Sequence, residues 1–173
     1  IAAGPDGRPL AAAETYLAVY LEQLGGGKTN VPLRGIQPAS LAIHGDRARI
    51  VEGRWPRWGS DEVVVGKPLV ERMKNCQIGA TLVLNTTPFA VVGVYEMAGA
   101  QGGEVWGDVE RMMEALERPY FQRVMAVLRE DTDVAVVAKA LEDDPRVASK
   151  LVTEKAYLLA QTGRLGGMLT VLA

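Results

Sequence analysis

The sequence contains one imidazole, His44, and one thiol, Cys76, and these are the side chains with which covalent catalysis could begin. Ser40 lies four residues before His44, so a helix here would place the hydroxyl and the imidazole on the same face. Catalysis of this kind needs a nucleophile beside a positioned base. No nucleophile elbow surrounds Ser40, and no local signature supports a pairing of Cys76 with His44. We therefore favour a surface histidine and a small buried or half-buried thiol.

Metal and nucleotide sites have equally weak support. One histidine and one cysteine cannot build a zinc site, and the acidic residues 130–133 lack the glycine and distant glutamate of a calcium loop. The loop 25–30 contains Gly-Lys-Thr, but a phosphate loop needs a further glycine five positions before Gly27, where the sequence has Glu22. We expect no catalytic residue, no metal and no cofactor in this domain.

Three tryptophans, Trp55, Trp58 and Trp106, lie in or beside expected loops. Large amphipathic rings in loops often serve as anchors of protein contacts. The alternative is that such rings fill the core, and we expect this of at least one of them. The three tryptophans are the candidate partner contacts.

The composition is that of a globular domain. The chain has 173 residues, of which 48% are hydrophobic and 23% charged, enough for one ordinary domain or two small lobes. A formal net charge of −2 gives no reason to expect nucleic acid as a partner. The longest apolar runs, such as 124–128 and 89–94, fall far short of the roughly 20 residues of a membrane span. A single cysteine leaves the redox compartment undecided.

Short runs of β-branched residues, each stopped by Gly, Pro, Asn or Asp, predict a compact sheet that would position these side chains. The expected strands are 15–22, 31–36, 49–52, 62–66, 79–84, 89–95 and 121–128. A helix is the alternative for the first of these, because the alanines at 11–13 favour helix by propensity. Strands 79–84 and 89–95 read as an antiparallel hairpin. Pro32 demotes the strand 31–36 towards a sheet edge, because proline cannot donate to a ladder.

Helices are expected at 38–44, 67–73, 109–116, 134–141 and 154–168. Asp108 and Asp133 are the predicted N-caps of the third and fourth of these helices. A last strand at 148–153 would complete a βαβ unit with the strand 121–128, and these two strands could then be parallel.

The two ends of the chain favour an excised piece of a longer protein, because the sequence begins without Met and ends in an apolar tail. The helix 154–168 fits a membrane-proximal segment, with a C-terminal docking helix as the alternative. Gly163, Gly166 and Gly167 interrupt it near its end and form a candidate hinge.

Six short phrases, in this order, resemble the MacB-like periplasmic core domain of FtsX-, LolE- and MacB-type ABC transporter permeases. They are Asn30 to Pro38, Arg49 to Trp55, Asp61 to Gly66, Ile78 to Leu82, Phe89 to Val94, and Glu104 to Asp108. Each phrase alone is a generic strand and turn. Six in sequence at suitable intervals are specific, and they cover residues 30–108.

The resemblance implies an α+β fold, a mixed sheet with a βαβ porter-like lobe plus a β-rich segment. Residues 1–30 would then be the N-terminal strand and loop of the porter-like lobe, and 31–108 the β-rich core segment. Residues 109–161 would be the βαβ return of that lobe. Residues 162–173 would be the membrane-proximal end leading to a transmembrane helix.

The resemblance further implies a non-catalytic domain at the periplasmic face of the bacterial inner membrane. Such a domain couples cytoplasmic ATP hydrolysis to extracytoplasmic conformational change and to export or extraction of a substrate. The implied partners are a cytoplasmic ATPase subunit, a periplasmic adaptor with an outer-membrane channel or a lipoprotein, and a second copy in the full-length protein. The residues themselves leave an alternative, a stand-alone secreted or cytosolic binding module without catalysis that uses the Trp-bearing loops.

Overall fold

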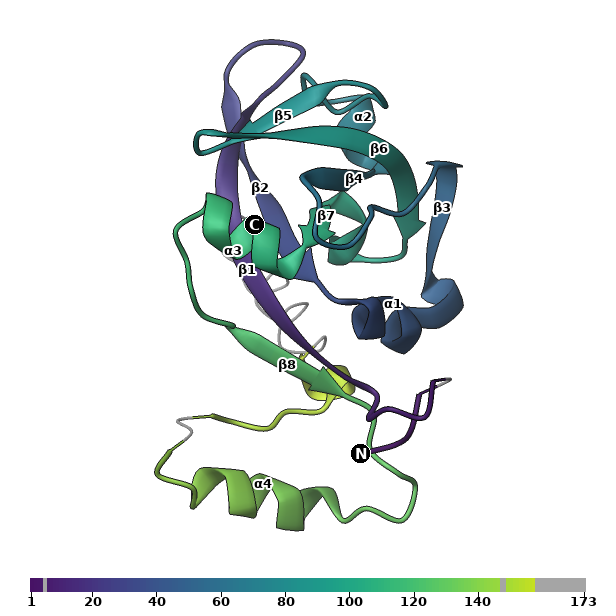
Figure 1. The fold of residues 1–173 in the computed structure, drawn as a ribbon, viewed down its shortest axis with the longest axis vertical. Helices are drawn as coiled ribbons and strands as arrows, with labels where there is room; N and C mark the ends of the chain where they lie inside the picture. The colour runs from purple at the N-terminus through teal and green to yellow at the C-terminus, as the bar shows by residue number, and fades with distance from the viewer. Residues whose placement is uncertain (5, 147–148, 158–173) are drawn as a thin grey trace, which may run out of the picture. The chain divides into compact units, whose positions relative to one another are not determined.

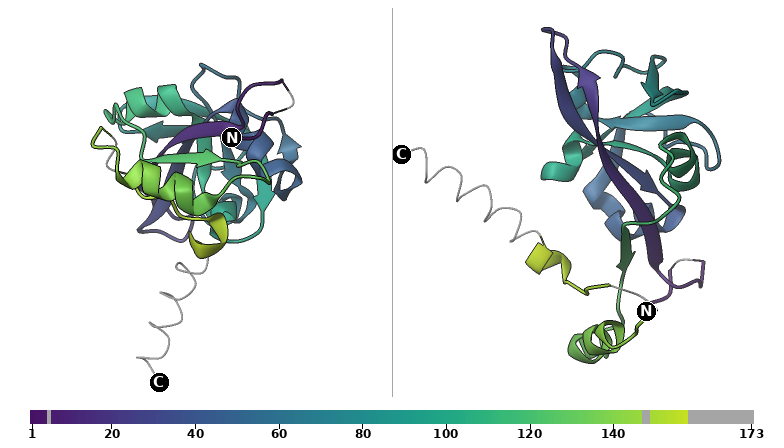
Figure 2. Two further views of the ribbon diagram at one scale, coloured as in Figure 1. Left: turned by 90° about the horizontal axis from the view of Figure 1, so that it is seen from below. Right: turned by 90° about the vertical axis from the view of Figure 1, so that its left-hand side faces the viewer.

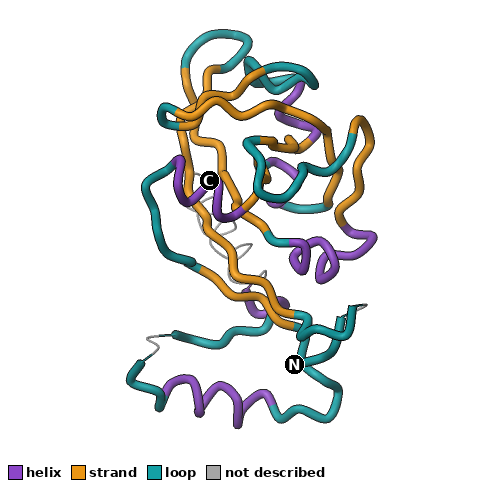
Figure 3. The backbone as a smooth tube through the Cα atoms, viewed as in Figure 1, coloured by secondary structure: helices purple, strands orange, loops and turns teal. Residues whose placement is uncertain are grey.

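The structure, a computed structural model, describes residues 1–4, 6–146 and 149–157. The chain divides into two units, Ile1–Leu128 and Arg129–Ala173. The first unit is built on a mixed eight-stranded sheet with short helices (Figures 1 and 3). The expected α+β class and mixed sheet are therefore confirmed.

The strands of the sheet come from the whole length of the first unit. They are β1 (Ala11–Glu22), β2 (Lys28–Ile36), β3 (Ala48–Gly53), β4 (Glu62–Gly66), β5 (Thr81–Leu84), β6 (Thr87–Met97), β7 (Val105–Asp108) and β8 (Arg123–Ala126). Their spatial order is β3-β6-β4-β7-β2-β1-β8, with β5 paired to β6. The pairs of β2 with β7 and of β4 with β6 are parallel, and the other pairs are antiparallel. The predicted hairpin is confirmed as β5 and β6.

The helices are short. They are α1 (Pro38–His44), α2 (Lys67–Val70), α3 (Val109–Ala115) and α4 (Val134–Glu142), with 3-10 turns η1 (Gly45–Arg47) and η2 (Ala100–Gly103). Asp108 accepts hydrogen bonds from the backbone N–H groups of Glu110 and Arg111, and Asp133 caps α4 in the same way. Both predicted N-caps are therefore confirmed, whereas α2 ends three residues earlier than expected.

The interior strand β4 shows that the sheet is covered on both faces. Alternate side chains of a strand point to opposite faces, and all five residues of β4 are buried. Val63 and Val65 belong to one core cluster, with Leu33, Phe89 and other apolar side chains. Val64 belongs to a second cluster, whose buried members are Ile36, Val64, Tyr95 and Trp106. A strand buried on both sides reads as a continuous apolar run, as β4 does.

The ribbon of β1 and β2 forms the long axis of the first unit (Figure 1), and its marked twist is visible in Figure 2. Gly35 of β2 allows α3 to approach this ribbon closely. A Cβ atom at this position would lie 2.8 Å from the Cα of Val109 and 2.6 Å from Cγ2 of Thr15. The approach fixes the start of α3, and with it the Asp108 carboxylate.

Pro32 does not mark a sheet edge, and that prediction was wrong. β2 lies between β1 and β7, well inside the sheet. Pro32 faces Ala18 across the ladder with β1, but the ladder with β7 starts only at Leu33. The proline is tolerated because it stands just beyond the end of the second ladder.

The predicted last strand is also wrong for the residues that the structure describes. Residues 149–153 have no strand conformation, so they form no βαβ unit with β8. A β-former needs a neighbouring strand and a buried face to become a strand. Val152, with 52% of its surface exposed, lacks such a buried face.

In the second unit, α4 is followed by helical residues 154–157, where the description of the chain ends. The candidate hinge at Gly163, Gly166 and Gly167 lies outside the described residues, as does the segment 162–173. None of the helices in the described ranges is long and apolar enough to cross a membrane. The predicted lobe boundaries after residues 30 and 108 stay predictions, although one sheet contains strands from both sides of each.

Candidate functional site

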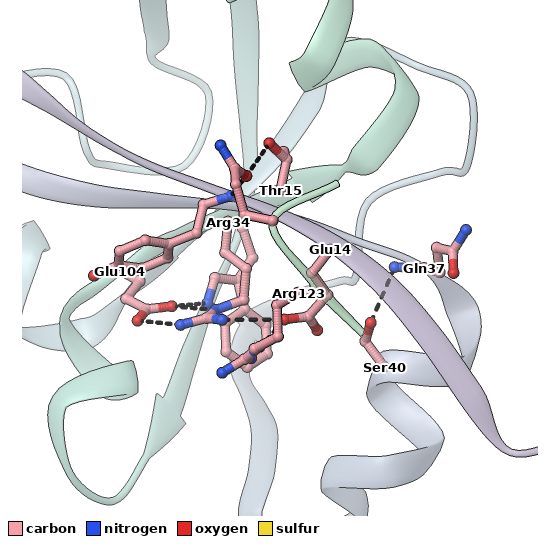
Figure 4. Close-up of polar contacts among 10 residues, drawn as sticks. Glu14, Thr15, Arg34, Gln37, Ser40, Glu104 and Arg123 are labelled. Atoms are coloured by element: carbon pink, nitrogen blue, oxygen red, sulfur yellow. Dashed lines mark hydrogen bonds and ion pairs between the residues drawn. The ribbon is translucent and has the colours of Figure 1, made fainter. Parts of the chain in front are cut away.

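Four charged side chains meet inside the first unit, and we call them the buried charge cluster: Glu14, Arg34, Glu104 and Arg123. They come from β1, β2, the residue before β7, and β8 (Figure 4). The side chains of Glu14, Arg34 and Glu104 are 0%, 3% and 3% exposed, and that of Arg123 is 25% exposed. Charges buried this deeply need partners, because leaving water is costly.

Arg34 and Glu104 form a two-pronged ion pair. The Arg34 Nε and Nη2 atoms donate to the two carboxylate oxygens of Glu104, each over 2.6 Å. The indole Nε1 of Trp106 also donates to Glu104, over 2.8 Å. The planar guanidinium matches both carboxylate oxygens at once, so this pair has a fixed geometry.

Glu14 connects this pair to the edge strand β8. Its Oε2 atom accepts from Arg34 Nη1 over 3.0 Å and from Arg123 Nη2 over 2.5 Å. Burial alone would lower the pKa of Arg34, but the hydrogen bonds and charges of Glu104 and Glu14 outweigh burial and raise this pKa. The guanidinium therefore stays charged, and two carboxylates hold it.

The edge strand β8 is attached mainly through polar contacts. It pairs with four residues of β1, from Ala11 facing Ala126 to Glu14 facing Arg123. Just before it, the amide oxygen of Gln122 accepts from the Thr15 hydroxyl over 2.7 Å and from a β1 backbone N–H over 2.6 Å.

The outward side chains of β8 bury little apolar surface, since Val124 is 67% exposed. The attachment of β8 therefore depends on its ladder and on the charge cluster, more than on core packing.

His44 and Ser40, the candidate catalytic pair, are both buried on α1, so the expected surface position of His44 was wrong. The Ser40 hydroxyl accepts a hydrogen bond from the backbone N–H of Gln37, over 3.1 Å. Among the described residues, neither ring nitrogen of His44 has a hydrogen-bond partner. The imidazole stacks on Trp106, with ring centroids 5.3 Å apart. A general base needs a hydrogen bond to the proton it removes, and no such bond joins these two side chains.

Burial lowers the pKa of His44, although the charge of Glu14 partly opposes this effect. The imidazole is therefore kept neutral in the core. Cys76 lies in the other core cluster, beside Val65 and Phe89, and burial raises its thiol pKa to about 11. Cys76 and His44 thus belong to the packing on different sides of the sheet. In the described ranges, no group of three or more potential ligands could hold a metal ion.

The three tryptophans have different positions. Trp106 is fully buried at the centre of the second cluster, so it is a core residue and not a contact surface. Trp55 is half-buried and stacks on Trp106, with centroids 6.3 Å apart. Trp58 keeps 40% of its surface exposed. Of the three candidates, Trp58 is the most exposed.

Trp55 and Trp58 lie in residues 54–61, which we call the Trp–Arg loop. Glu62 at the start of β4 fixes this loop. Its carboxylate accepts from both terminal nitrogens of Arg54, over 2.7 Å each, and from the backbone N–H and guanidinium of Arg57. The hydrogen bonds from Arg54 are the main reason that the pKa of Glu62 is lowered to about 2. The carboxylate therefore stays ionised well below neutral pH.

Sequence reasoning missed the buried charge cluster. A signal was present, because Arg34 interrupts the apolar run of β2 and Glu14 follows three alanines in β1. Charges inside strands that are otherwise apolar are unusual and need partners. The sequence alone does not say which acids and bases meet, since Glu14 and Arg123 are 109 positions apart.

One comparison with known proteins identifies a family. A model of the MacB-like periplasmic core domain matches residues 5–144 of the chain. No curated protein matches this sequence.

Among solved structures, the extracellular domain of the noncanonic ABC-type transporter YknZ from Gram-positive bacteria has a TM-score of 0.61 and 13% sequence identity, over 81% of this chain and 78% of that one.

Two further structures share the fold. The periplasmic region of MacB from Actinobacillus actinomycetemcomitans has a TM-score of 0.53 and 17% identity, over 75% of this chain and 62% of that one. A domain of a putative permease protein from Porphyromonas gingivalis has a TM-score of 0.55 and 14% identity, over 81% of this chain and 64% of that one. The chain thus spans less than two thirds of the length of these two solved chains.

The family model matches well over half of the length of this chain. The chain therefore belongs to the family of MacB-like periplasmic core domains, which are periplasmic domains of MacB-like ABC transporter permeases.

Proposed function

We propose that this domain passes conformational change, driven by ATP hydrolysis in the cytoplasm, to the periplasmic face of the bacterial inner membrane, where it supports export or extraction of a substrate. It performs no bond chemistry in this role. Its partners would be a cytoplasmic ATPase subunit and a second copy of the permease. On the periplasmic side we propose an adaptor with an outer-membrane channel, or a lipoprotein.

The observation that carries this proposal is that the chain enters and leaves the first unit at one place. The backbone N–H of Ala2 donates to the carbonyl of Val127 over 2.8 Å, and that of Val127 donates to Leu10 over 3.0 Å. A domain inserted between two membrane segments needs this arrangement, because both connections then reach the same surface.

The buried charge cluster supports a mechanical role for this junction. β8 is the last strand of the first unit, and the cluster connects it to β1, β2 and the start of β7. If the first unit moves as a rigid body, the strand through which the motion enters, β8, must not separate from the rest of the sheet. The ion pairs of the network resist separation, because opening would leave the buried charges of Glu14, Arg34 and Glu104 unpaired.

The proposal can be tested on the full-length permease, reconstituted with its ATPase in lipid vesicles. A spin label is attached to a cysteine that replaces Val83, which is 60% exposed on β5, whereas the native Cys76 is buried. The distance between the labels of the two copies is measured by pulsed electron resonance, without nucleotide and with ATP held unhydrolysed. We expect the distance distribution to shift on ATP binding. An identical distribution in both states, in a preparation that hydrolyses ATP, would refute the proposal that conformational change reaches this domain.

A further inference from the structure

Trp58 is the second residue of a β-turn that several hydrogen bonds hold in place. The turn runs from Arg57 to Ser60, closed by the Ser60 backbone N–H donating to the Arg57 carbonyl over 3.3 Å, and the Ser60 hydroxyl donates to the same carbonyl over 2.6 Å. Gly59 follows Trp58 with a φ of +74°, which a glycine adopts without strain. The Gly59 backbone N–H donates to the cap residue Asp108 over 3.1 Å. The exposed indole is therefore presented on a fixed backbone.

The Trp–Arg loop also has two guanidinium groups exposed to solvent, whereas Glu62, the carboxylate that pairs with both, is largely buried. The side chain of Arg57 is 76% exposed and that of Arg54 is 46% exposed, whereas that of Glu62 is 11% exposed. Arg57 Nη1 makes no hydrogen bond to any described residue, so its donors face solvent. The outward surface of the loop is thus positive and aromatic, although its charges are paired on the inside.

We propose that the Trp–Arg loop is a preformed docking site for an acidic, extended segment of a partner protein. A carboxylate would accept from the free donors of Arg57 in a charge-assisted bond, and the neighbouring apolar part of the segment would cover the Trp58 ring. Because Glu62 and Asp108 already hold the loop, binding would not have to order it, and this raises affinity.

The surroundings of the loop favour a narrow protein segment over an anionic membrane surface. Asp61, the last residue of the loop, is 37% exposed, and Glu114 on the neighbouring α3 is 72% exposed; both pair with Arg111 of α3. Glu110, on the same helix, is exposed as well. A broad anionic surface would face these carboxylates together with the two guanidinium groups, which like-charge repulsion opposes. A single extended strand can reach Arg57 and avoid them.

The test uses the full 173-residue chain and two synthetic pentapeptides with blocked ends, Gly-Glu-Phe-Glu-Gly and its amide counterpart Gly-Gln-Phe-Gln-Gly. The indole N–H signals of the tryptophans are followed by nuclear magnetic resonance during titration, and Trp58→Phe assigns one of them. We expect the acidic peptide to shift the Trp58 signal with saturation at about millimolar concentrations, and the amide peptide to bind about tenfold more weakly. The buried Trp106 signal should stay in place.

Two arginine variants complete the test. Arg57→Gln should weaken binding of the acidic peptide about tenfold. Arg49→Gln is the matched control, because Arg49 on β3 lies outside the loop, is 71% exposed and pairs with a single glutamate, Glu96 of β6. The Trp106 signal reports that each variant is folded.

Equal shifts with both peptides, no shift with either, or unchanged binding in Arg57→Gln would overturn the proposal. So would a Trp58 shift produced by vesicles of anionic phosphatidylglycerol but not by the acidic peptide. This inference does not depend on the proposed passage of conformational change, since these titrations involve neither ATP nor the membrane.

Discussion

Two regions of the first unit use the same pair of groups, arginine and glutamate, for different ends. In the buried charge cluster, Arg34 lies between Glu14 and Glu104, and all three side chains are nearly inaccessible to water. In the Trp–Arg loop, the carboxylate of Glu62 is buried but its arginine partners, Arg54 and Arg57, remain open to solvent. Burial of both partners makes a structural joint, whereas burial of one partner makes a fixed but available surface.

The two regions also differ in what they hold together. The cluster unites four strands or strand ends that are distant in sequence, so that its loss would affect the whole sheet. The loop is a local structure of eight residues beside β4, held by the residue that follows it. This contrast predicts a large, global effect of substitutions in the cluster and a small, local effect of substitutions in the loop.

The largest effect is expected for Glu104→Gln. The substitution removes one of the two carboxylates that hold the buried Arg34 guanidinium and leaves only Glu14 as its partner, and breaking a buried ion pair costs about 3 to 5 kcal/mol. Urea unfolding, followed by tryptophan fluorescence, measures this loss. The control is Glu96→Gln, which breaks exposed pairs with Arg49 and Lys67 and should cost less than about 1 kcal/mol. Similar losses in both variants would show that burial of an ion pair does not determine the cost of breaking it.

A smaller, local effect is expected for Arg123→Met, which removes the hydrogen bond between β8 and Glu14. Hydrogen bonds to charged groups contribute about 1.5 to 3 kcal/mol, so amide protons of β8 should exchange at least about tenfold faster. Amides of the central strand β4 should be protected nearly as before. Hydrogen exchange read by nuclear magnetic resonance separates the two strands. Unchanged exchange in β8 would mean that its ladder with β1 is sufficient.

The ion pairs of the Trp–Arg loop should affect how the free energy of unfolding depends on pH in acid. Because the pKa of Glu62 is about 2 in the fold and 4.5 ordinarily, its ionised form stabilises the fold fully above about pH 4.5. That contribution is lost as the pH falls from 4.5 towards 2. Glu62→Gln should therefore flatten the dependence of the unfolding free energy on pH in this window, whereas Glu52→Gln, at an exposed position, should not. Parallel pH profiles for wild type and Glu62→Gln would contradict the assignment.

The smallest effect is expected for His44→Phe, and its sign is positive. Phenylalanine keeps the stack on Trp106 and removes two buried nitrogens without partners, for a gain of about 1 kcal/mol at pH 7. The lowered pKa of His44 means that the wild type loses stability as the pH falls below 6.5, where the unfolded chain binds a proton more readily. The variant should lack this loss. Calorimetric melting at pH 7 and pH 5.5 measures both effects, and a variant less stable at both would count against a buried neutral imidazole.

Local pattern predicted most of the elements correctly, for physical reasons that particular residues illustrate. Asp108 and Asp133 were identified as caps because a carboxylate before a helix satisfies free amides whatever the rest of the fold does. The run from Val63 to Val65 was identified as a strand because its three β-branched residues stand directly before a glycine, and all three are buried in β4. The role of Trp58 as a partner contact stays a prediction, which rests on its residue type and its loop position.

The errors concern residues whose role depends on distant neighbours. Pro32 was assigned to an edge because nothing in the local sequence shows that β7, more than 70 residues later, pairs beside it. The strand at 148–153 was predicted from β-formers, which lack a partner strand in the described residues. The charge cluster was missed for the same reason, because its pairs join residues that only the folded sheet brings together.

The central claim is that β8 and the rest of the first unit move as one body when ATP drives the permease. The most direct test places one spin label at Val124 on β8 and one at Val83 on β5, in the same copy of the reconstituted full-length permease. The account predicts the same label-to-label distance without nucleotide and with bound ATP, together with a broader distribution in Arg123→Met. A distance in the wild type that changes on ATP binding would contradict it.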